Sequence, residues 1–233
     1  MNTLQYFLRR IFVSIIVFFG VSIVIFCLAR LIPGDPARIA LGPFATDEMV
    51  EQLRETLHLN ESIFIQYGIF IEKLFQGDLG ISTYTKRPVL VDIVSYFPAT
   101  FELVLMSGLL MILIGMPLGI LSGKFKNSII DNVARLISLL GVVTPSFLWA
   151  IILMLIFAFW FPILPVSERM NEALDPPTLV TGLLLVDSLL EGNFKVFGDA
   201  FLHLILPGLA IALPAIGNVA RLTRTNLDRK STR

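Results

Sequence analysis

The sequence contains few charged residues. Asp, Glu, Lys and Arg make up 15% of its 233 residues, whereas 55% are hydrophobic and the formal net charge is 0. A soluble domain has nearer a quarter of charged residues. The mean hydropathy of +0.81 agrees with this shortage. The composition therefore excludes an ordinary soluble domain and predicts a membrane protein, with membrane lipid and not nucleic acid as a partner.

Chemically reactive residues are also scarce. The single cysteine, Cys27, lies in an apolar run, so no disulfide within the chain is possible, and we interpret it as a packing residue. The only histidines are His58 and His203. Asp199 and His203 have the spacing of one helix face and would suit a metal pair or a proton relay, but we favour a helix start with Asp199 near its positive end.

Motifs for nucleotide hydrolysis and acyl transfer are absent. The sequence has neither Gly-x-x-x-x-Gly-Lys-Ser/Thr nor Gly-x-Ser-x-Gly. No predicted span carries an ionisable residue at its centre, which argues against a proton-driven carrier. We predict that the chain is not an enzyme and has no catalytic, cofactor-binding or metal-binding residues.

The sequence contains two long uncharged runs, Leu103–Gly123 and Leu136–Ser167, and the fold prediction starts from them. About 20 apolar helical residues cross a hydrocarbon core of about 30 Å, so the two runs predict a membrane hairpin. Ile11–Ala29 and Leu204–Ala220 are two further candidate spans. Ile11–Ala29 also resembles a signal peptide, but its length favours a retained helix. The predicted fold is all-α, with about four transmembrane helices and a small helical extracytoplasmic domain between the first and second.

The polar segments contain recognisable local signals. Thr46 is placed to cap an amphipathic helix, Ile63–Phe75 is a second helical segment, and Gly77–Ser82 is typical of a turn. Thr100 is predicted to cap the second transmembrane helix, with Glu102 near its positive end. Leu179–Leu190 is too short to cross and predicts an interfacial or re-entrant helix.

Small residues and prolines punctuate the spans. Gly115, Gly119 and Gly123 recur every four residues, which predicts a helix-packing face. Four prolines are predicted bend points, because neighbouring helices can satisfy the carbonyl groups that a proline leaves free in a membrane. These are Pro117, Pro145, Pro207 and Pro214.

The distribution of charge gives the orientation. With four spans, the N-terminus, the hairpin loop and the C-terminus share one side and hold 10 basic and 2 acidic residues. The opposite segments hold 8 basic and 16 acidic residues. By the positive-inside rule the first group is cytoplasmic. The predicted cytoplasmic anchors are Arg9, Arg10, Lys124, Lys126, Arg135, Arg221 and Arg224. We interpret Arg9-Arg10 as a cytoplasmic helix end in preference to a twin-arginine export signal.

These signals divide the chain into eight parts. They are a cytoplasmic head with transmembrane helix 1 (1–31), an extracytoplasmic domain (32–100), helix 2 (101–123), a cytoplasmic loop (124–135), helix 3 (136–163), an extracytoplasmic segment with an interfacial helix (164–203), helix 4 (204–220) and a cytoplasmic tail (221–233). The prediction is a multi-pass protein of the cell (inner) membrane.

The order of short motifs resembles the permease subunits of the dipeptide, oligopeptide and nickel ABC importers. The matching segments are Leu4, Tyr6 and Arg9-Arg10, Leu31–Pro36, Gln66-Tyr67, Gly77–Ser82, Pro98–Leu103, Gly115–Gly123, Thr144–Phe147, Phe161-Pro162 and His203–Pro207. The resemblance implies half of a translocation pathway for peptides, nickel or a related small solute, working by alternating access. It also implies as partners a second permease subunit, two ATPase subunits and an extracytoplasmic substrate-binding protein.

The sequence departs from this family in two places. Leu57-His58-Leu59-Asn60-Glu61-Ser62 stands where the family usually has Leu-Gly-Leu-Asp-x-Pro. The resemblance also fades after about Leu227, before the Glu-Ala-Ala coupling loop that docks in the ATPase. We therefore expect a truncated, frameshifted or split permease, and the alternative is a non-transporting membrane scaffold or inactive fragment.

Overall fold

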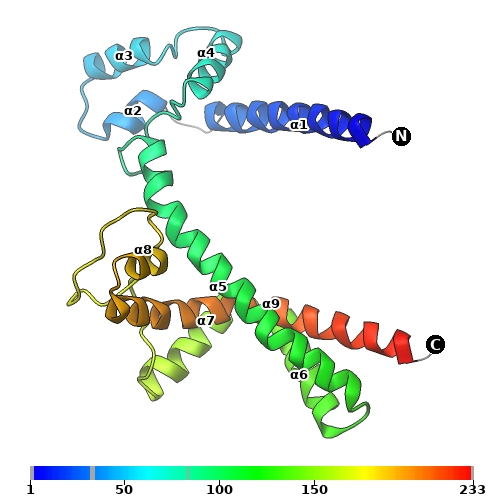
Figure 1. Ribbon diagram of the computed structural model, residues 1–233. Coiled ribbons are helices and arrows are strands. Elements are labelled where there is room, and N and C mark those ends of the chain that lie inside the picture. The colour runs from blue at the N-terminus through cyan, green and yellow to red at the C-terminus, as the bar shows by residue number, and fades with distance from the viewer. Residues whose placement is uncertain (1–2, 32–34, 83, 232–233) are drawn as a thin grey trace. The chain divides into compact units, whose positions relative to one another are not determined.

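The described part of the chain is built from helices, and its longest connection is the segment 161–183 between η1 and α8. The computed structural model describes residues 3–31, 35–82 and 84–231. Within them the only β pairing is an isolated bridge between Ile81 and Pro88. The helices are α1 (Thr3–Leu31), α2 (Pro36–Leu41), α3 (Asp47–Thr56), α4 (Ile63–Phe75), α5 (Val89–Lys124), α6 (Ile129–Val143), α7 (Ser146–Met154), the π-helix η1 (Leu155–Trp160), α8 (Leu184–Leu190) and α9 (Phe194–Ser231) (Figure 1).

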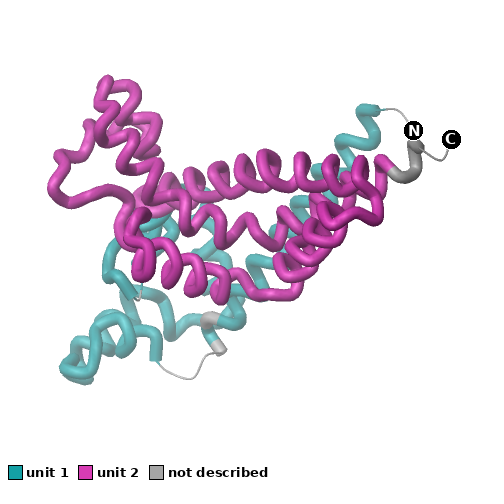
Figure 2. The backbone as a smooth tube through the Cα atoms, turned by 90° about the horizontal axis from the view of Figure 1, so that it is seen from below, with its two compact units in different colours: residues 1–93 teal, residues 94–233 magenta. Residues whose placement is uncertain are grey.

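These elements confirm the predicted all-α class. Among the described residues, α1, α5 and α9 are each long and apolar enough to cross a membrane, and a fourth span results if α6, α7 and η1 count as one broken span. The chain forms two compact units, residues 1–93 and residues 94–233 (Figure 2). Ile32, Pro33 and Gly34 of the first outer motif, and the last two residues of the tail, lie outside the described residues.

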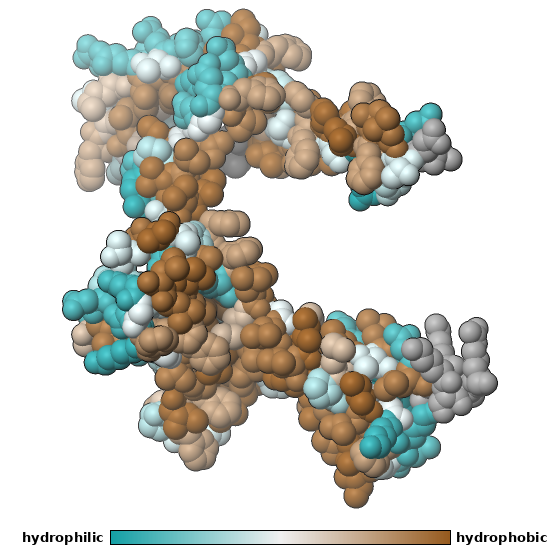
Figure 3. Space-filling model, in the orientation of Figure 1, coloured by the Kyte–Doolittle hydropathy of each residue, from teal (hydrophilic) through white to brown (hydrophobic). Residues whose placement is uncertain are grey.

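The first unit contains α1 and the small helices that follow it. Hydrophobic side chains cover much of the surface of α1 (Figure 3), as expected of a helix that faces lipid. Near the end of α1, Phe26 is buried against the rings of Tyr67 and Phe70 from α4. The hydroxyl groups of Ser22 and Tyr67 lie 2.8 Å apart. This aromatic contact joins α4 to α1.

Local signals in the first unit formed as predicted. Thr46 caps α3 by accepting a hydrogen bond from the backbone N–H of Met49. Gly77 and Gly80 both have positive φ, which confirms the turn.

Asp35 caps α2, and its carboxylate pairs with the guanidinium of Arg54 on α3 at 2.7 Å. Burial opposes ionisation of Asp35, but the hydrogen bond from Arg54 and those from the backbone outweigh it, so the pKa of Asp35 is lowered.

The second unit begins within α5, where one prediction was wrong. Thr100 does not cap a helix, because α5 starts at Val89 and runs through Pro98. The hydroxyl of Thr100 instead donates to the backbone carbonyl of Tyr96 at 3.3 Å. The apolar run marks where the helix becomes suited to lipid, whereas backbone hydrogen bonding begins earlier. The predicted start at residue 101 was therefore too late.

The segment expected to form one helix over 136–163 is interrupted. Helix α6 ends at Val143, and the following pair α7–η1 is bent from it by 112°. Thr144 has the extended backbone (φ −83°, ψ 126°) that proline favours in the residue before it. The break therefore falls at Pro145, where an interruption was expected.

Helix α9 is the central helix of the second unit. It packs against α6, α7 and α8 and is longer than the predicted span of 204–220 at both ends. Its buried residues are mostly small or branched, including Ala210, Ala212, Ile216 and Ala220. Small side chains let neighbouring helices approach closely where lipid provides no hydrophobic driving force.

Candidate functional site

Helices α5 and α9 cross at the three glycines of the predicted packing face. A Cβ atom at Gly115 would lie 3.1 Å from Val219, and one at Gly123 would lie 3.0 Å from Leu227. At Gly119 it would lie 2.6 Å from both the carbonyl oxygen of Ala220 and the Cβ of Thr223. Only glycine fits such an approach without a shift of the backbone. These distances support the packing role predicted for this face.

A second close contact joins α6 to α9. A Cβ atom at Gly141 would lie 2.7 Å from the carbonyl oxygen of Leu213, and one at Gly217 would lie 2.5 Å from the carbonyl oxygen of Ser138. The spacing rule did not single out Gly141 or Gly217, because the two glycines lie on different helices and form no ladder in either one.

The basic end of these helices is organised around Asp131, the third residue of α6, which is completely buried. Its carboxylate accepts hydrogen bonds from the hydroxyl of Ser122 on α5 at 2.6 Å and from the backbone N–H of Asn127 at 3.0 Å. Arg135 donates to both of its oxygens, at 3.2 and 2.5 Å. Nε and Nη2 of Arg224, on α9, lie 2.9 and 3.0 Å from the same two oxygens. Asp131 thus ties three helices together, and two predicted anchors, Arg135 and Arg224, are its partners.

The opposite end is organised around Glu102 of α5, whose side chain is 6% exposed. Glu102 accepts a hydrogen bond from Arg169 at 2.7 Å and another from the backbone N–H of Leu185 at 2.7 Å. Arg169 also donates to the carbonyl of Gly182 at 3.2 Å. Glu102 therefore attaches the 169–185 segment to α5. Because α5 starts at Val89, Glu102 lies inside the helix, and its predicted place near the positive helix end was wrong.

A cavity of about 230 Å³ lies beside this ion pair. Its lining includes Glu102 and Arg169 together with His203 and Pro207 of α9. His203 and Asp199 share one face of α9, with Nδ1 of His203 3.4 Å from Oδ2 of Asp199. The carboxylate of Asp199 also accepts a hydrogen bond from the backbone N–H of Asn171 at 2.7 Å. Among the described residues, no group of three His, Cys, Asp or Glu side chains has a metal-binding arrangement. Asp199 holds a loop against the start of α9.

Asp187 of α8 stabilises the loop that precedes its own helix. The backbone N–H groups of Val180, Thr181 and Gly182 and the hydroxyl of Thr181 all donate to its carboxylate, at 2.7 to 3.2 Å. Burial alone would raise the pKa of Asp187, but these hydrogen bonds outweigh it, so the pKa lies below the usual value. These hydrogen bonds tie residues 180–182 to α8, and the carbonyl of Gly182 in this loop accepts the hydrogen bond from Arg169.

The four predicted bend points occupy different local structures. Pro145 lies at the break between α6 and α7. Pro117 lies inside α5, and Pro207 and Pro214 lie inside α9, where the helices continue through them. Their place beside a pathway remains a prediction.

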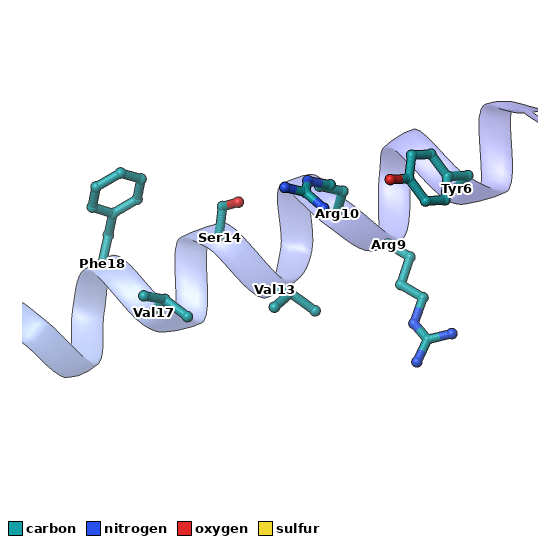
Figure 4. A pocket seen from close by; sticks show the side chains of 7 residues that line it. All are labelled: Tyr6, Arg9, Arg10, Val13, Ser14, Val17 and Phe18. Atoms are coloured by element: carbon teal, nitrogen blue, oxygen red, sulfur yellow. The ribbon is translucent and has the colours of Figure 1, made fainter. Parts of the chain in front are cut away.

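Arg9 and Arg10 lie near the start of α1, beside a surface hollow of about 500 Å³. Figure 4 shows that its labelled residues form two rows along the helix, with Arg10, Ser14 and Phe18 in one row and Arg9 and Val13 in the other. Every lining residue comes from α1. The hollow has no wall from a second element among the described residues, so it is a helix surface and not an enclosed binding pocket.

Two sequence families match the chain in succession. Residues 3–104 match the family described as the N-terminal part of binding-protein-dependent transport system membrane components. Residues 115–230 match the binding-protein-dependent transport system inner membrane component family. The chain belongs to the ABC importer permeases of the peptide family.

Individual permeases of this family are similar over nearly the whole chain. A probable D,D-dipeptide transport system permease protein of Escherichia coli K12 is 43% identical over 93% of this chain and 64% of its own length. A dipeptide transport system permease protein of Alkalihalophilus pseudofirmus is 38% identical over 96% of this chain and 67% of its own length. A di/tripeptide transport system permease protein of Pseudomonas aeruginosa is 34% identical over 95% of this chain and 66% of its own length. The chain thus spans about two thirds of these relatives.

Membership of this permease family agrees with the apolar helices and identifies a multi-pass protein of the inner membrane. The family consists of transport permease components, not enzymes. The sequence motifs identified the family. They missed the part that Asp131 and Glu102 play in holding the helices together. Both acids were visible as carboxylates at the edges of long apolar runs, and each has an arginine within reach in the structure.

Proposed function

We propose that this permease is a subunit of an ATP-driven importer of peptides and forms half of its translocation pathway. The observation that carries the proposal is the ordered match of residues 3–104 and 115–230 to the two parts of the family, together with relatives named as dipeptide permeases. A second permease completes the pathway, two ATPase subunits bind on the cytoplasmic side and an extracytoplasmic binding protein delivers the substrate.

The proposed mechanism is alternating access, in which the two ends of the helix core open in turn. Asp131 joins α5, α6 and α9 at the basic end, and Glu102 joins α5 to the 169–185 segment at the other end. Ion pairs with fixed geometry favour discrete packings over gradual deformation, which is what a two-state transition requires. In this proposal closure of the ATPases selects between the two packings, and the prolines of α5 and α9 and the break at Pro145 accommodate the change.

The proposed topology places the N-terminus, the loop 125–128 and the C-terminal end of α9 in the cytoplasm. Helices α6 and α7 with η1 then form one broken span. The support is the gathering of basic residues in these three segments.

The test is peptide uptake. Expression of this chain in a bacterium that lacks its own dipeptide permease gene, together with the neighbouring importer genes from the source of the chain, is expected to restore accumulation of a labelled dipeptide. A matched strain that carries an ATPase subunit with its phosphate-binding lysine replaced is expected to accumulate none. Assembly of the subunits without ATP-dependent uptake of any peptide would contradict the proposal and favour the scaffold alternative.

A further inference from the structure

A groove of about 320 Å³ runs between α5, α6 and α9 beside the buried Asp131. Its lining includes the basic residues Arg135, Arg221 and Arg224 and the apolar residues Ala134, Leu139 and Ala220. Ser122 and Ser138 complete the lining. The groove therefore combines three basic side chains with apolar side chains within one small volume.

The basic side chains carry more positive charge than the protein itself neutralises. Three arginines face one carboxylate, which leaves a formal charge of +2. Arg135 and Arg224 contact Asp131 through Nε and Nη2, and among the described residues no contact is found for either Nη1. Arg221 is exposed and has no ion pair within the described part of the chain. Guanidinium groups with free N–H donors bind phosphate oxygens in bidentate fashion.

The apolar side chains distinguish between possible anions. Leu139 is 53% exposed, whereas Ala134 and Ala220 are nearly fully buried, so Leu139 is the apolar side chain that a ligand can cover. A free phosphate or a small acid would leave this side chain uncovered. A phospholipid would place its phosphate on the arginines and the first methylene groups of an acyl chain on Leu139.

The position of the groove along the helices agrees with such a ligand. Arg221 directly follows the predicted span of 204–220, at the depth where lipid phosphates lie. Basic pockets between transmembrane helices on the cytoplasmic side are suited to anionic headgroups.

We propose that this groove is a binding site for one anionic phospholipid of the inner leaflet. The choice of leaflet rests on the cytoplasmic orientation proposed above, but peptide transport is not required for it. The site would hold a lipid against α6 and α9 next to the Asp131 cluster, so that bound lipid stabilises the packing of these two helices.

The test measures lipid retention by the full chain, purified in a neutral detergent and stripped of lipid. Native mass spectrometry during titration with phosphatidylglycerol, or with phosphatidylcholine of the same acyl chains, gives the affinity of the first bound lipid. We expect the first phosphatidylglycerol to bind at least fivefold more tightly than phosphatidylcholine. Arg221→Gln is expected to weaken it about fivefold, the effect of one basic residue near a lipid surface, whereas Arg221→Lys keeps most of the affinity.

Arg10→Gln is the matched control, because Arg10 is an exposed arginine at a predicted cytoplasmic helix end but lies on α1. It is expected to leave the first binding step unchanged. Equal affinity for the two lipids would overturn the proposal, as would equal effects of Arg221→Gln and Arg10→Gln. Displacement of the lipid by glycerol phosphate at equal concentration would show a site for free phosphate. Loss of the lipid on addition of the partner subunits would show that a protein surface occupies the groove, and would also overturn the proposal.

Discussion

Three buried carboxylates determine which segments of the second unit meet. Asp131, Glu102 and Asp187 are all nearly inaccessible, and each accepts hydrogen bonds from several donors. A buried charge is costly unless it is paired and hydrogen-bonded, and so it strongly favours the one packing that supplies its partners. Apolar side chains on the same helices would allow many alternative contacts.

The pairing of Glu102 with Arg169 is expected to be measurable as a coupling energy. Glu102→Gln keeps an acceptor for the N–H of Leu185 but removes the charge that Arg169 faces, so the helix core is expected to lose stability. In a double-mutant cycle with Arg169→Gln, thermal unfolding in detergent should give a coupling of about 1–3 kcal/mol. Glu172→Gln, which changes an exposed acid in the same unit, is the control and should have little effect. A cycle with no coupling would show that the two charges do not interact in solution.

The lowered pKa of Asp187 predicts a dependence of stability on pH. The folded state binds a proton on this carboxylate less readily than the unfolded chain does, so its contribution is fully present above the ordinary pKa of about 3.9 and is lost as the pH falls through the lower folded value. Asp187→Asn is therefore expected to lower the Tm at pH 7 by a few degrees.

The difference in Tm between the wild-type protein and Asp187→Asn should narrow below about pH 4. Asp175→Asn, at an exposed position in the same segment, should show no such difference at any pH. If the difference in Tm between the wild-type protein and Asp187→Asn stays constant or widens in acid, the role given to the Asp187 carboxylate is contradicted.

At the scale of whole helices, the approach of α5 to α9 depends on glycine. Gly119→Ala places a methyl group 2.6 Å from the backbone of α9, and the resulting shift is expected to cost about 1–3 kcal/mol of unfolding free energy. Gly108→Ala is a matched control on α5, because nothing lies within 4 Å of its Cβ position. It should be neutral or slightly stabilising, since alanine favours a helix. Equal unfolding midpoints for the two variants in detergent would show that α5 and α9 do not pack closely there.

The features that the sequence predicted best are those that depend on local signals. The Thr46 cap, the helix Ile63–Phe75 and the Gly77 and Gly80 turn each depend on a few neighbouring residues, and all are present. Helix α5 begins before the predicted span of 101–123, and helix α9 extends beyond the predicted span of 204–220 at both ends. The charge pattern locates the apolar core of a span, whereas the backbone continues its hydrogen bonding into water without any change in composition.

The ion clusters could not be predicted because their partners are far apart in sequence. Arg224 reaches Asp131 from 93 residues away, and Leu185 reaches Glu102 from 83 residues away. Periodicity identifies which face of a helix is apolar but not which other helix meets it. The sequence therefore indicated that Arg135, Arg221 and Arg224 lie at one side of the membrane, without indicating that two of them share a buried carboxylate.

For the whole molecule, the broken segment α6–α7–η1 decides the topology. A bend of 112° is compatible with a broken span that crosses the membrane and equally with a re-entrant loop that returns to the same side. The charge distribution favours crossing, since it places Lys124 and the acidic 164–203 segment on opposite sides. The two topologies differ in the side on which Glu172 lies.

Single-cysteine labelling distinguishes these topologies, because Cys27 is the only cysteine in the chain. In a Cys27→Ser background, Glu172→Cys should react with a membrane-impermeant maleimide in intact spheroplasts, and Lys124→Cys should react only in inside-out vesicles. Both positions are exposed in the structure, so a difference in labelling reports the side of the membrane and not burial. The Cys27→Ser parent should remain unlabelled in both preparations. Labelling of both cysteines from one side would make α6–α7–η1 a re-entrant loop, which would place the C-terminal end of α9 outside and reverse the proposed position of Arg221 and Arg224.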